Sequence, residues 1–507
     1  MSLFPGLKPS KIYAVKKGRV PGIYETWEEA NEQIKGFSGA THASFKTREE
    51  ATEYMETKTL DDLFVPREIP QLNAQQRKAF DAIVAGKSIF LTGPGGTGKS
   101  FLLQNLYAHY HSHTGKKIAI TALTGCAAVL IGPFAKTLHS WAGIGLGRGD
   151  ADVLAQTIAR DKRKGPRWRS TSCLVIDEVS MMTPGLLDLL DKVGRVTRKS
   201  DKPFGGLQIV FVGDFYQLPP VSKEGPSGFA FNSPLWKVDE TIFLTEIVRQ
   251  KDPVFQQILN EARVGDLSAE SYEILESRKT MEWKRQEIKP TLLFTKNTDV
   301  NAINEAQMKK LPGEEHVFEA KTMAPENMQV DIVQILVEKL DRDAPYEVEL
   351  RLKERAQVML LKQMYENDEK DGLTPIHGLV NGSRGVVTGI AGEGNPIVKF
   401  LNGRTMTVRP AIWASDDDDD AVKREQIPLR VAYALTIHKA QGASLDSALV
   451  DVGPSTFECG QAYVALSRVR SLESLFIFEI SKRAFRAHLD VKEFYAGLSQ
   501  KIDPVQG

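Results

Sequence analysis

Short apolar runs alternate with segments of helical periodicity over most of the chain. The first run, residues 89–92, enters a glycine-rich turn, and apolar side chains then recur at helical spacing from Phe101 to Tyr110. Further runs, each separated from the next by helical or loop sequence, occupy residues 118–122, 174–177 and 209–213. Strands that alternate with helices predict a parallel sheet with helices on both faces.

A second region with the same alternation follows. Its apolar runs occupy residues 292–295, 429–435, 448–452 and 475–478. Residues 356–410 interrupt this region with β-like runs punctuated by glycine, and we interpret them as a small inserted β-barrel. The inserted runs are residues 358–361, 385–388 and 397–401.

The first part of the chain predicts a separate small α+β module, and residues 60–70, with Pro66 and Pro70, predict a linker after it. The pattern in the module is a strand, a turn, an amphipathic helix, a second strand and a second helix. The expected division is an N-terminal module (1–58), a linker (59–71), a first α/β domain (72–238), a second α/β domain in two pieces (239–355 and 425–507) and the insert (356–424).

Length and composition agree with a chain of several globular domains. It has 507 residues, of which 42% are hydrophobic and 26% are charged. No apolar run approaches the roughly 20 residues of a membrane span, and no secretory signal pattern is present. We therefore expect a soluble intracellular protein of the cytoplasm or nucleus, with no membrane partner.

Charge and cysteine spacing exclude two further classes. The formal net charge is zero, so any nucleic-acid site must be a local patch rather than bulk attraction. Cys126, Cys173 and Cys459 lie far apart, so the sequence encodes neither a Cys-x-x-Cys zinc site nor a disulfide framework.

The glycine-rich turn has the pattern of a phosphate-binding loop, and it stands where that pattern requires, between a strand and a helix. Glycines let backbone N–H groups face phosphate oxygens, Lys99 neutralises β/γ charge, and Ser100 supplies a magnesium ligand. A chance glycine loop is the alternative. The expected nucleotide-binding residues are Gly93, Gly95, Gly96, Thr97, Gly98, Lys99 and Ser100.

Two adjacent carboxylates, Asp177 and Glu178, end the apolar run at 174–177. We expect Asp177 to hold magnesium together with Ser100, and Glu178 to orient or deprotonate the attacking water. A solvated strand end is the alternative interpretation.

Phosphoryl transfer also needs cations on the γ-phosphate. Arg249, in Glu246-Ile-Val-Arg-Gln250, and Arg468, in Ala465-Leu-Ser-Arg468, stand in the second α/β region and could reach a nucleotide only across an interdomain cleft. Taken alone, each is more typical of a surface ion pair than of a phosphate contact.

Further motifs follow one another from about Leu72 to Ile480. They are Leu72-Asn-Ala-Gln-Gln76, Thr121-Ala-Leu-Thr-Gly125, Thr137-Leu-His139-Ser140, Lys202-Pro-Phe-Gly-Gly206, Gly213-Asp-Phe-Tyr-Gln217-Leu-Pro-Pro, Leu435-Thr436-Ile-His438-Lys-Ala-Gln441-Gly442 and Gln461-Ala-Tyr-Val-Ala-Leu-Ser-Arg468. Together they resemble the PIF-type helicases, a branch of the RecD-like 5′-to-3′ superfamily 1 motors. The resemblance implies two RecA-like motor domains, ATP and Mg²⁺ as cofactors, and movement from 5′ to 3′.

The same resemblance implies roles for single residues. Gln76 is expected to contact adenine, Gln217 to sense the γ-phosphate, and Arg468 to act as the arginine finger beside Arg249. The polar groups expected on strand phosphates and sugars are Thr124, Thr137, His139, Thr436 and His438. Each of these is as well explained by a helix cap or a loop hydrogen bond.

A basic and aromatic cluster surrounds Arg167 and Trp168. It is expected either to grip the backbone or stack a base near the duplex junction, or to be a solvated loop with a packed tryptophan.

The N-terminal module contains the motifs Tyr13-Ala-Val-Lys-Lys17-Gly-Arg19, Gly22-Ile-Tyr24, Thr26-Trp27-Glu and Phe45-Lys-Thr-Arg-Glu-Glu-Ala51. Together they resemble the small N-terminal domain of eukaryotic ribonuclease H, which binds RNA–DNA hybrids. By this resemblance Trp27 lies beside the DNA strand, and Lys16, Lys17 and Arg19 line the binding surface. His42 and Ala43 stand where the family has an aromatic residue and a lysine. A module for protein docking or folding is the alternative.

These features predict a monomeric ATP-dependent DNA helicase acting on single strands and duplex junctions, in replication, repair, recombination or telomere maintenance. One alternative is a hybrid-binding tether, or a translocase without unwinding activity, in which ATP switches the grip. A motor that moves on RNA is another.

Overall fold

The computed structural model describes most of the chain. The described residues are 11–35, 41–56, 72–132, 134–145, 150–220, 228–286, 288–326, 328–343, 345–362, 365–368, 372–375, 379, 382–414 and 421–502. The predicted linker, residues 59–71, lies outside them. The chain divides into two compact units, and the smaller one contains Met1–Glu68, Ala108–Gly115 and Tyr365–Pro375.

A three-stranded antiparallel sheet with two helices forms the N-terminal module, and β1 is its central strand. Its elements are β1 (Ile12–Lys17), β2 (Gly22–Tyr24), α1 (Trp27–Ile34), β3 (Thr41–Phe45) and α2 (Arg48–Glu56). Thr26 caps α1, because its side chain accepts a hydrogen bond from the N–H of Glu29 at 3.3 Å. The predicted module is confirmed, with β2 as an additional strand.

Six parallel strands form the first large sheet, in the order β6-β5-β7-β8-β4-β9. They are β4 (Ile89–Thr92), β5 (Lys117–Ala122), β6 (Lys136–Thr137), β7 (Thr171–Asp177), β8 (Gln208–Gly213) and β9 (Glu240–Phe243). All of β4 is buried, as expected of a parallel strand covered on both faces.

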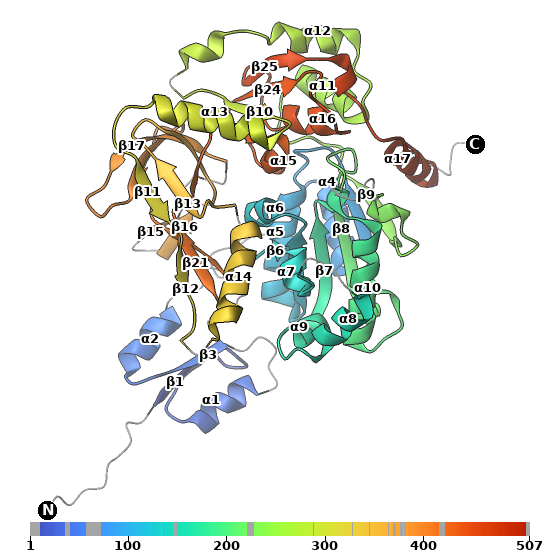
Figure 1. Cartoon of the computed structure of the whole chain (residues 1–507). Helices are drawn as coiled ribbons and strands as arrows, with labels where there is room; N and C mark the ends of the chain where they lie inside the picture. The colour runs from blue at the N-terminus through green and yellow to red at the C-terminus, as the bar shows by residue number, and fades with distance from the viewer. Residues whose placement is uncertain are drawn as a thin grey trace, which may run out of the picture. The chain divides into compact units, whose positions relative to one another are not determined.

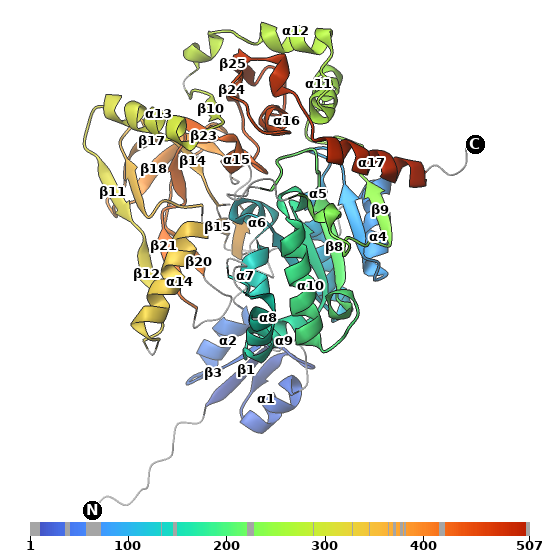
Figure 2. The same ribbon diagram turned by 45° about the vertical axis from the view of Figure 1, so that its right-hand side comes forward.

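Helices lie on both faces of this sheet (Figures 1 and 2). They are α4 (Ala74–Val84), α5 (Lys99–His109), α6 (Gly125–Ile131), α7 (Leu138–Ala142), α8 (Ala151–Arg160), α9 (Lys164–Ser170) and α10 (Pro184–Arg198). Leu187 and Leu190 of α10 share a buried cluster with Leu174 and Ile176 of β7. Because side chains alternate along a strand, Val175 is buried towards the opposite face. The predicted two-sided parallel sheet is confirmed.

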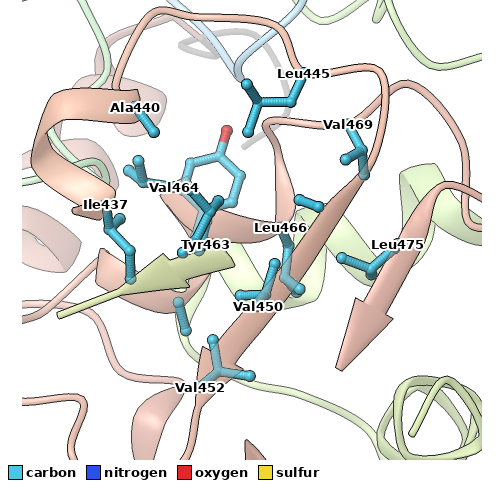
Figure 3. Packing of buried hydrophobic residues seen from close by; sticks show 14 of the residues in the cluster. Ile437, Ala440, Leu445, Val450, Val452, Tyr463, Val464, Leu466, Val469 and Leu475 are labelled. Atoms are coloured by element: carbon cyan, nitrogen blue, oxygen red, sulfur yellow. The ribbon is translucent and has the colours of Figure 1, made fainter. Parts of the chain in front are cut away.

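The second large sheet has four parallel strands, in the order β23-β10-β24-β25. Its elements are α11 (Pro253–Val264), α12 (Ala269–Ser277), β10 (Thr291–Phe294), α13 (Asn297–Lys310), β23 (Ala434–Thr436), α15 (Ile437–Ala440), β24 (Ala448–Val452), α16 (Gln461–Leu466) and β25 (Leu475–Ile480). Figure 3 shows part of its core, where Val450 and Val452 of β24 lie near Ile437 of α15 and Val464 of α16. The ring of Tyr463 lies in the same cluster, and its hydroxyl is directed away from Val450 and Val452 (Figure 3).

The insert consists of antiparallel sheets with the orders β19-β18-β17-β14-β22, β12-β21-β20 and β11-β13. Its elements are β11 (His316–Glu319), β12 (Lys321–Met323), α14 (Val330–Asp343), β13 (Glu349–Leu352), β14 (Gln357–Leu360), β17 (Arg384–Ile390), β18 (Pro396–Phe400), β19 (Thr405–Thr407), β20 (Ala411–Ala414), β21 (Lys423–Gln426) and β22 (Leu429–Val431). The predicted β-rich insert is confirmed as a set of antiparallel sheets; among the described strands no pairing joins β19 to β22, and closure into a barrel stays a prediction. A hairpin of β15 (Tyr365–Asp368) and β16 (Gly372–Pro375) belongs to the smaller unit.

Three parts of the predicted division are wrong. β9, which we assigned to the second α/β domain, pairs with β4 in the first sheet. The insert begins before residue 356 and ends after residue 424, since β11, β12, β13 and β22 belong to its sheets. The third error concerns α17 (Leu489–Ile502), because its Val491 and Tyr495 pack into the core of the first domain.

None of the helices in the described part of the chain combines the length and the apolar character needed to cross a membrane.

Candidate functional site

The glycine-rich turn leads from the end of β4 into α5. Gly96 and Gly98 have φ angles of +87° and +82°, a region that side chains rarely adopt. A Cβ on Gly96 would lie 2.7 Å from the Cβ of Arg249, and a Cβ on Gly98 would lie 2.5 Å from Nε2 of Gln76. Both positions therefore require glycine for conformation and for close approach, which leaves the backbone open to a bound anion.

The Lys99 ammonium folds back over this turn. Its Nζ donates hydrogen bonds to the carbonyl oxygens of Gly93 at 2.7 Å and Pro94 at 2.8 Å. Burial lowers the pKa of Lys99, while the nearby carboxylates of Asp214 and Asp177 act in the opposite direction. A phosphate would give this half-buried cation an anionic partner in place of two neutral carbonyls.

Asp177 and Glu178 stand at the end of β7. Burial, with a further contribution from the charge of Glu178, raises the pKa of Asp177 to about 7. Glu178 has a left-handed backbone, with φ 56° and ψ 41°, which is strained for a residue with a side chain. The solvated strand end is excluded for Asp177, which is only 6% exposed.

One cavity of about 290 Å³ brings the predicted groups together. Its lining residues are Gly95, Gly96, Gly98, Lys99, Ser100, Phe101, Asp177, Glu178, Gln217, Val248, Arg249, Gly442 and Arg468. Gly442 and Arg468 come from the second parallel-sheet domain, so the cavity lies between the two domains of the larger unit.

The chemistry of the lining fits a magnesium ion. Ser100 and Asp177 offer hydroxyl and carboxylate oxygens, the donor type that this hard cation prefers. The described residues contain no group of three or more His, Cys, Asp or Glu side chains that could enclose a metal. An ion held by these two groups would keep several waters and take further ligands from a nucleotide phosphate, as Mg²⁺ usually does.

Both predicted arginines reach this cavity, and neither forms an ion pair among the described residues. The guanidinium of Arg249 donates to the carbonyl of Ser467 at 3.2 Å. Arg468 is 2% exposed, and burial together with the neighbouring charge of Arg249 lowers its pKa to about 10. The surface ion pair is therefore excluded for Arg468. Two arginines without carboxylate partners, one of them buried, give the cavity a lining that suits a multiply charged anion.

The two predicted glutamines have different surroundings. Gln217 lines the cavity, and its buried Oε1 has no hydrogen-bond partner among the described residues. Gln76 lies outside the lining, where its Nε2 donates to the carbonyl of Thr97 at 3.2 Å and its Oε1 caps the N–H of Asn73. Gln76 thus holds the glycine-rich turn through the carbonyl of Thr97. Its contact with adenine stays a prediction.

Sequence reasoning missed a buried cluster around Asp214. Arg263 of α11 binds both carboxylate oxygens of Asp214 at 2.8 Å. The hydroxyls of Tyr463 and Tyr495 each lie 3.4 Å from the same carboxylate. Tyr463 also accepts a hydrogen bond from the N–H of Gly95 at 2.8 Å. Asp214 and Tyr463 stood within recognised motifs, but nothing in the sequence linked them to Arg263 or Tyr495.

The threonines predicted to contact a strand are helix caps. Thr124 caps α6, Thr137 caps α7 and Thr436 caps α15, each accepting a hydrogen bond from the N–H three residues later. The capping interpretation is therefore confirmed for all three. His139 lies on α7 and His438 on α15, and burial lowers the pKa of His438. Strand contacts by these residues stay predictions.

The predicted stacking role of Trp168 is wrong. Its side chain is fully buried in the core of the first domain, and its indole N–H donates to the carbonyl of Ala142 at 3.1 Å. Arg167 donates to the carbonyls of Ser140 and Trp141 at 3.3 and 3.1 Å. The burial of Trp168 confirms the alternative interpretation, a packed tryptophan. A large apolar ring is more stable when it is buried than when it is exposed to water.

In the N-terminal module, Trp27 is 40% exposed and lies between the rings of Tyr13 and His42, with centroid distances of 5.4 and 5.5 Å. Lys16 is held inside the module, donating to the carbonyl of Tyr54 at 3.0 Å. Arg19 is exposed and bonds the carbonyl of Glu32. Lys17 ends β1, and its side chain lies outside the described part. The module therefore has an aromatic cluster of Trp27, Tyr13 and His42. The ammonium of Lys16 already forms a hydrogen bond within the module.

Two parallel-sheet domains enclose a phosphate-loop cavity, with acids from the first domain and an arginine from the second, and this arrangement is the fold of a two-domain P-loop protein. Residues 71–271 match the PIF1-like helicase family, and residues 11–55 match the ribonuclease H1 N-terminal domain. The chain belongs to the PIF1-like helicase family.

Relatives agree with this assignment over most of the chain. The human ATP-dependent DNA helicase PIF1 is 40% identical over 444 residues, which are 86% of this chain and 65% of that protein. The crystal structure of the Pif1 helicase from Candida albicans is similar with a TM-score of 0.70 at 35% identity, over 84% of this chain and 99% of that chain. A Bacteroides Pif1 bound to ssDNA is similar with a TM-score of 0.60 at 28% identity, over 85% of this chain and 98% of that chain. This chain thus spans just under two thirds of the length of the human relative.

Proposed function

We propose that the chain is an ATP-dependent DNA helicase that moves 5′ to 3′ along single-stranded DNA and unwinds duplex DNA or RNA–DNA hybrid. One observation carries the proposal. The phosphate loop, the Asp177–Glu178 pair and two arginines without carboxylate partners line one cavity between two parallel-sheet domains. The family, the human helicase relative and the ssDNA-bound Bacteroides protein support the choice of substrate.

The lining residues suit ATP hydrolysis. Lys99 and the backbone of the loop bind the β- and γ-phosphates. Glu178 accepts the proton of the water that attacks the γ-phosphorus, and Arg249 with Arg468 stabilises the charge that spreads over the phosphoryl oxygens. An arginine in this role is worth about 10³ to 10⁵ in rate.

Ser100 and Asp177 are the residues that would hold Mg²⁺. When bound, the ion neutralises charge on the β- and γ-phosphate oxygens. Asp177 favours the ion because its carboxylate is buried and lacks a cationic partner at hydrogen-bond distance in the described chain.

ATP drives movement by changing the cleft. Bound ATP attracts Arg468 towards the first domain and closes the cavity, and loss of phosphate lets the cavity reopen. If strand contacts near α7 and near α15 tighten alternately, each cycle advances the protein along the strand. Such a motor serves replication, repair, recombination or telomere maintenance.

Unwinding assays with a directional substrate set test the proposal. Duplexes with a 5′ tail, a 3′ tail or no tail, in DNA–DNA and RNA–DNA versions, are mixed with ATP and Mg²⁺, and Lys99→Ala serves as the inactive control. We expect unwinding from the 5′ tail alone. ATPase activity stimulated by single strands without any unwinding would favour a gripping or translocating ATPase instead.

The N-terminal module supports a second element of the proposal, the recruitment of the motor to RNA–DNA hybrids. Its match to the ribonuclease H1 N-terminal domain and the exposed Trp27 favour this role. Removal of residues 1–58 separates a helicase from a tether. A helicase keeps strand-stimulated ATPase after the truncation, whereas a tether loses most of its affinity for nucleic acid.

A further inference from the structure

Glu178 receives a hydrogen bond from the opposite domain. The Nε2 of Gln441 lies 3.1 Å from its Oε2, and no other described residue donates a hydrogen bond to this carboxylate. A carboxylate is an acceptor only, so the amide nitrogen of Gln441 must be the atom that faces it. The adjacent Gly442 has φ +80°, and a Cβ there would lie 3.7 Å from Oε1 of Glu178 and 2.9 Å from Leu130. The segment 441–442 therefore approaches the acid by its backbone as well.

The position of Gln441 is fixed by the arginine that also lines the cavity. Arg468 donates to the carbonyls of Ala440 at 3.5 Å and Ala443 at 3.2 Å, which flank the segment 441–442 on both sides. The N–H of Gln441 bonds the carbonyl of His438 at 3.3 Å, at the end of α15. Gln441, Arg468 and α15 are thus parts of one hydrogen-bonded unit.

Gln441 also carries an unused acceptor. Its side chain is 5% exposed, and its Oε1 is buried without a hydrogen-bond partner among the described residues. This oxygen belongs to the same amide group that holds Glu178. A buried acceptor in that position costs about 1 to 3 kcal/mol unless a donor completes it, and the O–H of a water beside Glu178 is a suitable donor.

From these contacts we propose that Gln441 is a positioning residue that aims the Glu178 carboxylate at the attacking water and links α15 to hydrolysis. The inference rests on the proposed ATPase function. In the step concerned, the water oxygen bonds to the γ-phosphorus, and the bond between that phosphorus and the bridging oxygen of ADP breaks with its electron pair leaving on ADP. The water proton passes to Glu178, and the second water hydrogen is held by Oε1 of Gln441.

The link to the nucleic acid follows from the place of α15. Thr436 caps this short helix, His438 lies on it, and both are expected to contact the strand. A strand that shifts α15 therefore shifts Gln441 relative to Glu178. By thermodynamic reciprocity, the state of the phosphoryl site must change strand affinity through the same contact.

Gln441→Glu tests the proposal with little change in size. The variant removes the donor and places a negative charge beside Glu178. We expect kcat with saturating oligothymidylate to fall about 10- to 100-fold, as for a misplaced catalytic group, while KM for ATP changes less than about twofold. Gln441→Ala should lower kcat by a similar factor. Gln257→Glu on the exposed face of α11 is the matched control and should keep wild-type kinetics.

A double-variant cycle distinguishes positioning from a general structural effect. If Gln441 acts through Glu178, adding Gln441→Ala to Glu178→Gln changes the residual turnover by less than about twofold. The affinity for oligothymidylate should differ between the ADP and ADP–aluminium fluoride states of the wild type, and this difference should shrink in Gln441→Glu. Melting temperature and ADP affinity serve as readouts of folding and of the nucleotide site.

Different results would overturn the role of Gln441 and the proposed ATPase function. Wild-type kcat in Gln441→Glu, or losses that multiply in the double variant, would overturn the role of Gln441. A wild-type protein that fails to hydrolyse ATP with single strands would instead overturn the proposed function.

Discussion

Arg263 and Asp214 form a bidentate ion pair across the two parallel-sheet domains, with both N–O distances at 2.8 Å. Asp214 is fully buried, and the Arg263 guanidinium lies 4.6 Å from the ring centre of Tyr216. The carbonyl of Asp214 accepts the N–H of Gln217 at 2.9 Å, so the pair anchors the turn that carries Gln217 into the cavity. The carboxylate of Asp214 also raises the pKa of Arg263 against the opposing effect of burial.

Breaking this pair is the first prediction. Arg263→Met leaves the buried charge of Asp214 uncompensated, and we expect a loss of about 3 to 5 kcal/mol in the free energy of unfolding, measured by denaturant titration. Arg351→Met, which breaks an exposed pair with Glu315, is the control and should leave the free energy of unfolding nearly unchanged, because solvent screens the pair. Adding Asp214→Asn to Arg263→Met should recover part of the loss. Equal effects of Arg263→Met and Arg351→Met would contradict the assignment.

The second prediction concerns the attachment of α17 to the first domain. The Tyr495 hydroxyl lies 2.6 Å from Oγ1 of Thr92 and accepts the N–H of Phe215 at 3.2 Å. Tyr495→Phe leaves the buried N–H of Phe215 and the buried hydroxyl of Thr92 without this partner, so we expect a cost of about 1 to 3 kcal/mol, measured by thermal unfolding. Tyr272→Phe removes a hydroxyl that bonds no described residue, and it should change stability by less than about 0.5 kcal/mol. If Tyr495→Phe costs as little stability as Tyr272→Phe, the hydrogen bonds of Tyr495 do not hold α17 on the first domain.

Trp168 provides the third prediction, because its burial replaces the expected base contact. Trp168→Ala removes a fully buried ring from the first-domain core, and we expect a loss of about 3 to 5 kcal/mol in the free energy of unfolding. The folded fraction should bind oligothymidylate with wild-type affinity, measured by fluorescence anisotropy at a temperature where the variant is folded. A selective loss of strand affinity without loss of stability would restore the stacking role.

Trp27 should behave in the opposite way. It is 40% exposed beside Tyr13 and His42, so Trp27→Ala should cost little stability. We expect binding of a labelled RNA–DNA hybrid to weaken by about 1 to 3 kcal/mol, the value of one aromatic stacking contact, with ATPase activity retained. Val20→Ala, at another exposed apolar side chain of the module, is the control. Unchanged hybrid affinity in Trp27→Ala would favour a protein-docking module.

The lining of the candidate nucleotide site could be predicted because its residues are contiguous in sequence. Gly93 to Ser100 and Asp177–Glu178 each follow an apolar run, and parallel topology brings the ends of such runs to one edge of the sheet. The contact of Asp214 with Arg263 spans 49 positions, and that of Thr92 with Tyr495 spans 403. No local pattern encodes such pairings, which depend on how the two domains pack.

The errors in the fold have a similar cause. β9 begins with Glu240, and only one of its four residues is buried, so it lacks the continuous apolar run that marks β4. The apolar run at residues 429–435 is continuous in sequence, but it forms two strands in different sheets, β22 and β23. Local hydrophobicity specifies that a segment is buried, whereas its sheet partner is a tertiary property.

The last prediction concerns Asp177 and Mg²⁺. Burial raises the pKa of this carboxyl to about 7, whereas an aspartate in an unfolded chain titrates near about 3.9. Between these values the folded protein holds a proton that the unfolded chain has released, so stability falls as the pH rises. The contribution is fully present below about pH 4 and is lost as the pH passes 7. Asp177→Asn cannot ionise, so its melting temperature should fall less between pH 5 and pH 8 than that of the wild type.

Mg²⁺ should offset the loss of stability that ionisation of the buried Asp177 causes, because a bound cation favours the charged carboxylate. With a non-hydrolysable ATP analogue, Mg²⁺ should raise the melting temperature of the wild type more at pH 8 than at pH 5, since binding at low pH must first displace the proton. Removal of the ion with a chelator should return the wild type to its lower value. Asp177→Asn should show a smaller rise and no such pH dependence, and Asp201→Asn at an exposed carboxylate should match the wild type. If Asp177→Asn keeps the full response, the ion is held by the nucleotide and Ser100, and Asp177 is a buried acid that does not bind the ion.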